Sequence, residues 1–351
     1  MDDCFAKLIQ GLPEAMDGQL AFLAEHDLFA LTVPCDFGGR GLPMADAVAL
    51  TFALARRNGS AGLTYAMHLA QRHTWAAHVK DSIYLAEELR QLVASRRLVA
   101  SVVSEPQTGG DIHKAAAELG GVLQKTTSNT SYVPQAGAFL VTAMDMSGTK
   151  PVQRLVMVRA DATQARELRR NQMMGMNQIH NAAWEFRFTH PPQAVFAEPF
   201  SAIASTTMTG ATHLLWAAMW SGLAAHALDT AQTFAKKELT LEIAAQVQVE
   251  LSELRNKHYV LNALIRDNLT PTSNPFANAA NINRLKIIGS ESAAVVALGC
   301  LTLIGLRAYA EGGRYSLSEV VRDTLSGPLM VANARLQSNS AGIDRYSEDR
   351  P

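Results

Sequence analysis

Residues 98–200 lack the helical periodicity that marks the chain on either side of them. Within this block, β-branched and aromatic residues gather in short runs separated by turn residues, and apolar and polar side chains alternate at 183–188. Such runs are typical of strands, and alternation indicates a strand with one buried face. The block predicts a small, mostly antiparallel β-domain with strands near 98–103, 122–127, 138–143, 154–159 and 183–188.

The segments that flank this block are helical. Apolar residues at helical spacing predict short helices before residue 98 and longer ones at 211–237, 241–266, 277–310 and 318–336. Because amphipathic helices must bury their apolar faces, we expect one helical body with the β-domain seated against it. The expected fold class is α+β and mainly α, with an N-terminal helical domain at 1–97, the β-domain at 98–200, a C-terminal four-helix bundle at 201–337 and a frayed polar tail at 338–351.

Composition argues against several classes of protein. Only 18% of the residues are charged, which leaves little solvated surface and predicts an oligomer. The net charge is −1 and no Lys/Arg stripe occurs, so no nucleic acid partner is expected. The longest apolar run, 293–306, is shorter than the ~20 residues of a membrane span. Three distant cysteines and an acidic start without a secretory signal predict a cytoplasmic protein with no metal site.

One loop stands out at the end of the first predicted strand. The apolar run at 98–103 ends abruptly in Ser104, Glu105 and Pro106, and a Gly-Gly-Asp turn follows at 109–111. Glycines lack the Cβ atoms that would block close approach, and open N–H groups can hold a flat polar ligand or a phosphate. The alternative is an ordinary connection from a strand to a turn.

Four motifs follow one another in order along the chain. Residues 33–41 read Val-Pro-Cys-Asp-Phe-Gly-Gly-Arg-Gly, residues 104–111 read Ser-Glu-Pro-Gln-Thr-Gly-Gly-Asp, a Phe begins 188–193, and an Arg-Asp pair occupies 322–323. Together they resemble the Val-Pro-x-x-x-Gly-Gly-x-Gly, Thr-Glu-Pro-x-x-Gly-Ser-Asp, Phe-x-x-x-x-Val-Pro and Arg-Asp motifs of the acyl-CoA dehydrogenase family. The resemblance covers nearly the whole chain and implies an acyl-CoA dehydrogenase-like fold.

The resemblance also implies a cofactor site. In that family FAD lies between the β-domain and the C-terminal helices, and a neighbouring subunit completes the site. Carried over by position, the flavin-binding residues would be Val103 and Ser104 at the ring, Gly109 and Gly110 in the loop by the phosphates, Ser131 near flavin N5, and Asn129 in place of an aromatic residue. Tyr132 is a candidate substitute for that missing aromatic ring.

The sequence departs from the family pattern at the positions of the catalytic base and at two other motifs. The family's catalytic Glu lies eight residues after the Arg-Asp aspartate, and here that position is Val331, which cannot accept a proton. The other position that some members use for the base holds Thr212 and His213. The family's Arg-x-x-Phe-Gly is replaced by Lys-Lys-Glu-Leu at 236–239, and its late Gly-Gly motif is reduced to Gly-Leu-Arg at 305–307. The resemblance therefore implies a weakened FAD site.

These features leave three functional hypotheses. The leading one is an FAD-dependent acyl-CoA dehydrogenase-like oxidoreductase that acts on an acyl thioester or a related small carbonyl compound. Such α,β-dehydrogenation needs a base for the α-proton and a flavin that takes a hydride at N5, so the absence of the carboxylate favours two alternatives. One is a non-catalytic partner subunit of a hetero-oligomer, and the other is a flavin-dependent monooxygenase on the same fold.

Several single residues have two possible roles. His213 is the candidate catalytic base, and its alternative is a histidine hydrogen-bonded inside a helix interface. His68, His73 and His78 recur every five residues, which turns them ~140° apart on a helix, so they are not expected to share a metal.

Two residue pairs are expected to be structural. Arg322 and Asp323 are interpreted as an ion pair or a subunit contact, and Trp216 and Trp220, four residues apart on one helix, as core or interface residues.

Overall fold

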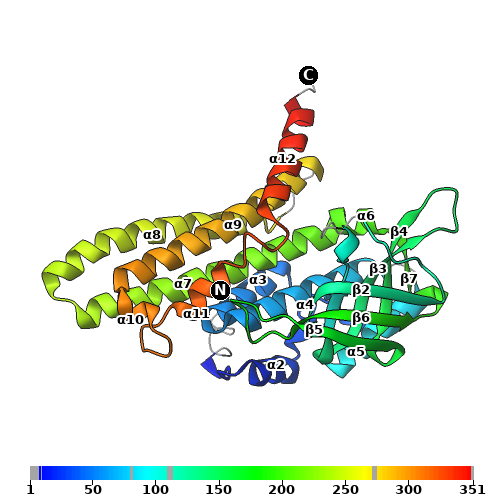
Figure 1. The fold of residues 1–351 in the computed structure, drawn as a ribbon, viewed down its shortest axis with the longest axis horizontal. Coiled ribbons are helices and arrows are strands. Elements are labelled where there is room, and N and C mark those ends of the chain that lie inside the picture. Colours follow the sequence, from blue (N-terminus) through cyan, green and yellow to red (C-terminus); the bar gives the residue numbers. More distant parts are fainter. Residues whose placement is uncertain (1–7, 9, 80–81, 109–113, 271–274, 349–351) are drawn as a thin grey trace.

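The computed structural model describes residues 8, 10–79, 82–108, 114–270 and 275–348. The strands gather at one end of an elongated molecule, and the long helices α7, α8 and α9 extend away from them (Figure 1). Helices α3 and α4 lie between these two parts. The predicted architecture, a helical body with a β-domain seated against it, is confirmed.

The first helical part surrounds one buried helix. Helix α4 packs on α3, α7 and the first strand, and most of its side chains are buried all round. It begins where Asn58 Oδ1 accepts a hydrogen bond from the Ala61 amide at 2.9 Å, a standard N-terminal cap. The four described helices of this part are α2 (Met16–Glu25), α3 (Met44–Arg57), α4 (Gly59–Ala77) and α5 (Ile83–Ser95).

In the described part of the chain, seven strands form two sheets. Strands β1 and β3 pair in parallel and the other pairs are antiparallel, with the order β1-β3-β4-β7 in one sheet and β2-β6-β5 in the other. The strands are β1 (Leu98–Val102), β2 (Val122–Ser131), β3 (Ala136–Asp145), β4 (Val152–Arg159), β5 (Thr163–Arg170), β6 (Asn181–Thr189) and β7 (Val195–Pro199).

All five predicted strands are present, and two others were missed. Strand β5 is exposed along nearly its whole length and is rich in Arg, Gln and Glu, so it carries no apolar alternation. The alternation predicted at 183–188 is confirmed, because Trp184, Phe186 and Phe188 are buried on one face of β6. The rings of Phe186 and Phe188 lie 5.8 and 5.9 Å from that of Phe139 in the other sheet, which joins the two sheets.

The C-terminal helices form the long part of the body. Helix α6 (Phe200–Ile203) and a π-helical segment (Ala204–Met208) lead into α7 (Thr209–Glu238), which packs against α8 (Leu241–Asp267) and α9 (Pro275–Ile304). The short helices α10 (Leu306–Tyr309) and α11 (Ser318–Thr324) follow, and then α12 (Asn333–Glu348).

Three features differ from the prediction. The helix expected at 318–336 is interrupted, because α11 ends at Thr324 and α12 begins at Asn333. The third long helix ends at Ile304 rather than near 310, because Gly305 takes a positive φ of 74° that breaks the helix. The tail expected to be frayed is helical as far as Glu348, and α12 projects from the body beside α9 (Figure 1). Its first residues pack on α9, which supports a helix that the polar composition alone did not predict.

Helix α9 is longer and more apolar than the run of 293–306 suggested. Among the described residues, Asn278–Ile304 is the one segment with the length and hydropathy of a membrane span, and 44% of its most apolar window is buried inside the protein. The helix also carries Lys286, Ser290 and Glu291, which form polar contacts with the residues after α11. It contacts α7, α8, α11 and α12, so we interpret it as a core helix of the bundle.

Candidate functional site

A buried ion pair anchors the loop that follows β1. The Glu105 side chain is 3% exposed, and its Oε1 accepts a hydrogen bond from the Ala117 amide at 3.1 Å while Oε2 accepts one from the Ala116 amide. Lys125 Nζ lies 3.3 Å from Glu105 Oε1 and is fully buried. Charge-assisted bonds of this kind are strong when both partners are removed from water. The loop therefore starts from a fixed position.

Lys125 extends the same network into the neighbouring sheet. Its Nζ donates to the carbonyl oxygen of Thr142 at 2.8 Å and to Thr142 Oγ1 at 2.9 Å. Thr142 Oγ1 in turn donates to the carbonyl oxygen of Val103 at 3.3 Å. Burial lowers the pKa of Lys125 to about 8, and the Glu105 carboxylate opposes that shift, so the ammonium form prevails at neutral pH. The end of β1 is thus joined to β2 and β3 through the Lys125 ammonium group.

This network positions two of the predicted cofactor residues. Val103 and Ser104 directly precede Glu105 at the end of β1 and are partly buried, so part of each remains open to a ligand. Gly109 and Gly110, predicted near the phosphates, lie outside the described residues.

The other predicted residues lie at the end of β2. Ser131 is partly buried, and its Oγ donates to Asn181 Oδ1 at 2.6 Å. Asn129 is exposed, and its Oδ1 accepts a hydrogen bond from Asn171 Nδ2 at 2.9 Å. The pairing of β2 with β6 shifts register between Thr127 and Thr130, so Asn129 lies in an irregular part of the strand.

Tyr132 does not have the surroundings of a ring that stacks on a cofactor. It is 2% exposed, its φ is 44°, and its hydroxyl donates to the carbonyl oxygen of Val99 at 3.1 Å. The suggestion that it substitutes for the missing aromatic residue is therefore wrong, because its ring is part of the core. The neighbouring strand β6 offers Trp184, which is 5% exposed and whose Nε1 has no partner among the described residues.

On the bundle side, a second buried cation holds the segment that contains Val331. Lys286 is fully buried and its Nζ donates to the carbonyl oxygen of Gly327 at 3.0 Å and to Asn333 Oδ1 at 2.6 Å. Asn333 Nδ2 donates to Ser290 Oγ at 3.1 Å. Val331 itself is partly buried and has a φ of 49°, which is rare for a β-branched residue. The position thus combines an apolar side chain with a strained backbone.

His213 lies on α7 inside the bundle and faces α9. Its side chain is 3% exposed, it hydrogen-bonds to the carbonyl oxygen of Ile282, and its ring centroid is 6.2 Å from that of Trp216. Burial first and the Lys286 charge second lower its pKa to about 3. A neutral imidazole with so low a pKa is a weak base at neutral pH, so these surroundings match the helix-interface alternative. Its catalytic role stays a prediction.

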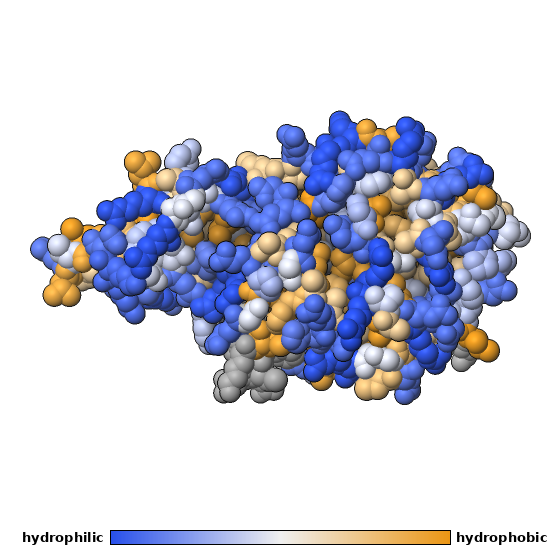
Figure 2. Space-filling model, turned by 90° about the horizontal axis from the view of Figure 1, so that it is seen from below, coloured by the Kyte–Doolittle hydropathy of each residue, from blue (hydrophilic) through white to orange (hydrophobic). Residues whose placement is uncertain are grey.

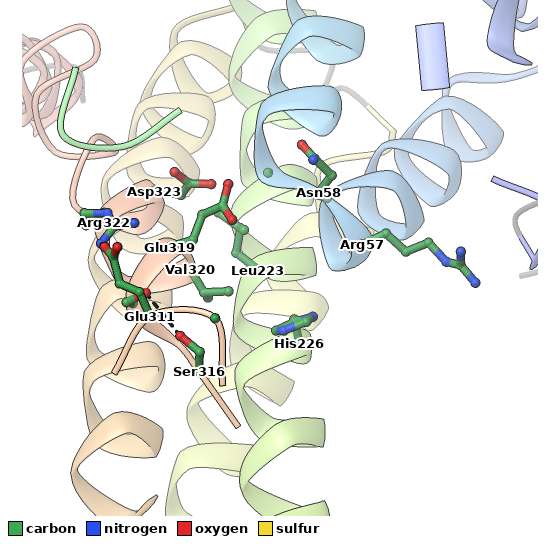
Figure 3. Close-up of a pocket in the computed structure, with 14 residues that line it drawn as sticks. Arg57, Asn58, Leu223, His226, Glu311, Ser316, Glu319, Val320, Arg322 and Asp323 are labelled. Atoms are coloured by element: carbon green, nitrogen blue, oxygen red, sulfur yellow. Dashed lines mark hydrogen bonds and ion pairs between the residues drawn. The ribbon is translucent and has the colours of Figure 1, made fainter. Parts of the chain in front are cut away.

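A polar pocket opens between the start of α4, the middle of α7 and helix α11 (Figure 3). Its volume is about 380 Å³. Glu319 and Asp323 point toward the start of α4 at Asn58, whereas the side chain of Arg57 points away from it. Its lining comprises Ala55, Arg57, Asn58, Gly59, Leu223, His226, Glu311, Gly312, Ser316, Ser318, Glu319, Val320, Arg322 and Asp323.

Asp323 joins this pocket to the β-domain. Its side chain is 1% exposed, and its Oδ1 accepts a hydrogen bond from the Met176 amide at 2.5 Å. Burial raises its pKa to about 7, and the Met176 N–H opposes that shift. A Cβ added to Gly59 would lie 2.4 Å from Asp323 Oδ2, so only glycine fits beside the carboxylate. Arg322 forms an ion pair with Glu311 at 2.7 Å, so its ionic partner is Glu311 rather than Asp323, and the alternative of a subunit contact stays a prediction.

His68 and His78 contact different parts of the structure. His68 Nδ1 accepts a hydrogen bond from the Val99 amide at 2.9 Å, and its Nε2 lies 3.0 Å from the carbonyl oxygen of Phe29. His78 instead contacts Glu198 and Thr207. No group of three or more potential metal ligands occurs in the described part of the chain. The tryptophans expected in the core are there, because Trp216 is 8% and Trp220 0% exposed.

Sequence reasoning missed the two buried lysines, and it identified Asp323 only as part of the Arg-Asp motif, without its buried position beside the pocket. Lys125 alone carried a usable signal, because it shares the buried face of β2 with Leu123 and Thr127, where a charge needs a partner. Lys286 carried none, and the Arg-Asp motif did not indicate the contact of Asp323 with the Met176 amide, since the partners of both residues are distant in sequence.

Comparison with known proteins supports the fold. No protein-family model and no curated protein matches the sequence. Among solved structures, a nitrososynthase from Micromonospora carbonacea var. africana is 19% identical, with a TM-score of 0.78 over 97% of this chain and 94% of that one. Butyryl-CoA dehydrogenase from Megasphaera elsdenii is 16% identical, with a TM-score of 0.74 over 93% and 88%.

A third similar structure is the dibenzothiophene monooxygenase TdsC from Paenibacillus sp. A11-2, which has also been solved with FMN bound. It is 15% identical, with a TM-score of 0.75 over 93% of this chain and 89% of that one. The order of the elements and the two-sheet domain agree with these similarities. The chain has the acyl-CoA dehydrogenase fold.

Proposed function

We propose that the chain is a flavin-dependent oxidoreductase that binds FAD or FMN against the ends of β1 and β2. The supporting observation is the network of Glu105 and Lys125, which fixes the loop directly after Val103 and Ser104. Structures with the same fold include the FMN-bound TdsC and a butyryl-CoA dehydrogenase. The two flavins share the same reactive ring, so this wall is compatible with either.

The residues present fit such a cofactor. Val103, Ser104 and Ser131 are only partly buried, and they would contact the flat ring by van der Waals packing and by a hydroxyl. Trp184 keeps a buried Nε1–H without a partner among the described residues, which would be satisfied by an acceptor atom of a ligand or by water. When bound, a flavin supplies hydride and electron transfer, which no side chain of this protein provides.

Proton transfer separates the two reactions that this fold would support. Dehydrogenation of an acyl thioester or a related carbonyl compound needs a base at the α-carbon, and Val331 offers none. Asp323 is a buried carboxylate with a pKa of about 7, but it already accepts the Met176 N–H. The second candidate, flavin-dependent monooxygenation, needs no carboxylate at 331. The apolar side chain of Val331 favours this second reaction.

Turnover of the flavin-loaded protein tests this choice. A monooxygenase consumes oxygen when a flavin reductase and NADH supply reduced flavin, and it gives no dye reduction with acyl-CoA substrates under anaerobic conditions. A dehydrogenase shows the reverse pattern. A chain that shows neither activity alone but acquires one with a co-expressed related chain is a partner subunit.

We also propose that the chain forms an oligomer through its long helices. Hydrophobic side chains lie exposed on both α8 and α9, among them Val249, Tyr259, Val295 and Leu298, which are 64%, 68%, 49% and 43% exposed. Figure 2 shows further hydrophobic residues among hydrophilic ones at the narrow end of the molecule, where α7 joins α8. Exposed apolar surface of this kind is typical of subunit interfaces.

Light scattering during size-exclusion chromatography tests the oligomer. The native chain is expected to elute as a dimer or tetramer. The double substitution Val295→Glu and Leu298→Glu is expected to shift the mass toward the monomer, because charges at an apolar interface are costly to bury. A matched control replaces two exposed polar residues of the same region, Glu250→Gln and Glu253→Gln. A native chain that elutes as a monomer would contradict the proposal.

A further inference from the structure

Three side chains from separate elements meet beside the π-helical segment. His78, which follows the last turn of α4, places its Nε2 at 2.9 Å from Thr207 Oγ1. Its Nδ1 forms a hydrogen bond with the carboxylate of Glu198 at the end of β7. A hydroxyl, an imidazole and a carboxylate thus lie in a chain of hydrogen bonds, which is the order of groups that activates a hydroxyl nucleophile.

The π-helical segment sets Thr207 apart from its neighbours. The hydroxyls of Ser205 and Thr206 donate back to the carbonyl oxygen of Ala202 at 3.1 and 2.7 Å, as helical hydroxyls commonly do. The hydroxyl of Thr207 instead meets the imidazole of His78, and it lies 3.5 Å from that of Thr206. Single turns of π-helix recur at functional sites, where the extra residue changes the direction of a side chain.

The Glu198 carboxylate determines which tautomer the His78 imidazole adopts. An acceptor at Nδ1 selects the tautomer that carries its proton there, which leaves the lone pair on Nε2 directed at Thr207. We propose that Thr207, His78 and Glu198 form an acyl-transfer site, separate from the proposed flavin site, that takes small activated esters or thioesters.

The position of the three groups allows a small substrate to reach the hydroxyl. Thr207 is partly buried, and the adjacent Ser205 and Thr206 are exposed, so the segment borders solvent. The Glu198 side chain is 26% exposed and that of His78 is 8% exposed. The imidazole is therefore largely shielded while the hydroxyl remains at the edge of the surface. An ester can approach Thr207 from the solvent side.

The reaction balances with water as the second reactant. Thr207 Oγ1 attacks the acyl carbon and forms an ester bond, His78 Nε2 takes the hydroxyl proton, and the same proton goes to the leaving alkoxide or thiolate. Water then attacks the acyl-threonine, His78 takes a proton from that water, and the carboxylic acid leaves as the proton returns to Thr207. No oxidant or reductant is needed, so the site works in the flavin-free protein.

Hydrolysis of p-nitrophenyl acetate by the purified full chain, without flavin, tests this site. The native protein and Thr207→Ser are expected to release nitrophenol at least tenfold faster than Thr207→Val, because positioned nucleophile and base pairs contribute roughly 100-fold or more. His78→Gln is expected to lose the same activity. The matched control is Thr206→Val, which removes the adjacent hydroxyl and is expected to keep the native rate.

Mass spectrometry of quenched samples adds a readout that a purely structural contact would not change. An acetyl group on Thr207 in the native protein, and its absence in His78→Gln, supports the relay. The proposal is overturned if Thr207→Val hydrolyses the ester at the native rate, or if the acetyl group is found only on other residues. Loss of flavin binding would leave these results unaffected, so the two proposals fail separately.

Discussion

Replacing Lys125 with methionine is expected to lower the free energy of unfolding by about 3–5 kcal/mol, the range found when one partner of a buried ion pair is removed. The substitution leaves the Glu105 carboxylate, which is 3% exposed, without the ammonium group 3.3 Å away. It also removes the donor to Thr142, which joins β3 to the end of β1. The loss is measured by urea unfolding of the native and variant proteins.

Two further variants separate this effect from a general loss of charge. The double substitution Glu105→Gln and Lys125→Met removes both charges and is expected to recover part of the loss, because no uncompensated charge remains buried. Arg166→Met breaks the pair of Arg166 with Glu185, whose side chains are 69% and 53% exposed, and is expected to cost less than about 1 kcal/mol. Equal losses for Lys125→Met and Arg166→Met would show that the buried pair has no special role.

Ionisation of Asp323 is expected to make the free energy of unfolding depend on pH, and the substitution Asp323→Asn is expected to remove most of this dependence. The folded-state pKa of Asp323 is about 7, above its usual value near 4. Between these values the folded protein keeps a proton that the unfolded chain releases, so stability falls as the pH rises through this window. The full difference is on the order of 4 kcal/mol. Asp323→Asn is therefore expected to be more stable than the native protein at pH 8 and similar to it near pH 4.

The measurement is urea unfolding from pH 4 to pH 8.5, with the difference between native and variant taken at each pH. The amide oxygen that Asp323→Asn introduces can still accept the Met176 N–H, so the comparison isolates ionisation. Asp161 is the matched control, because it is exposed and its hydrogen bond with Arg159 lowers its pKa. Asp161→Asn should therefore not gain stability as the pH rises. A difference between native and Asp323→Asn that stays constant with pH would contradict the assigned burial of the carboxylate.

The periodicity of apolar residues predicted most of the fold, because an element that buries one face carries apolar residues at regular spacing. The alternation around Trp184 and the amphipathic helices of the bundle are visible in the residues themselves. Strand β5 escaped detection for the same reason, since its side chains are exposed on both faces. The helical tail escaped because its stability comes from contact with α9 rather than from its own composition.

The candidate site was less predictable, because its important contacts join distant segments. The motif at 104–111 marked the loop after β1, but only the fold brings Lys125 to Glu105. The Arg-Asp pair was recognised at 322–323, yet Asp323 binds an amide 147 residues away in the chain. The apolar side chain of Val331 was visible in the sequence, whereas its positive φ depends on the packing of the turn that contains it.

Equilibrium titration of the purified chain with FAD and with FMN tests the proposed flavin site most directly. The native protein is expected to bind one flavin per chain in a saturable manner. Ser104→Phe places a large ring in the wall at the end of β1 and is expected to weaken binding at least tenfold, whereas Ser147→Phe, at an exposed position in the same domain, is expected to bind as the native protein does. Failure of the native chain to bind either flavin, or equal binding by Ser104→Phe, would contradict the proposal.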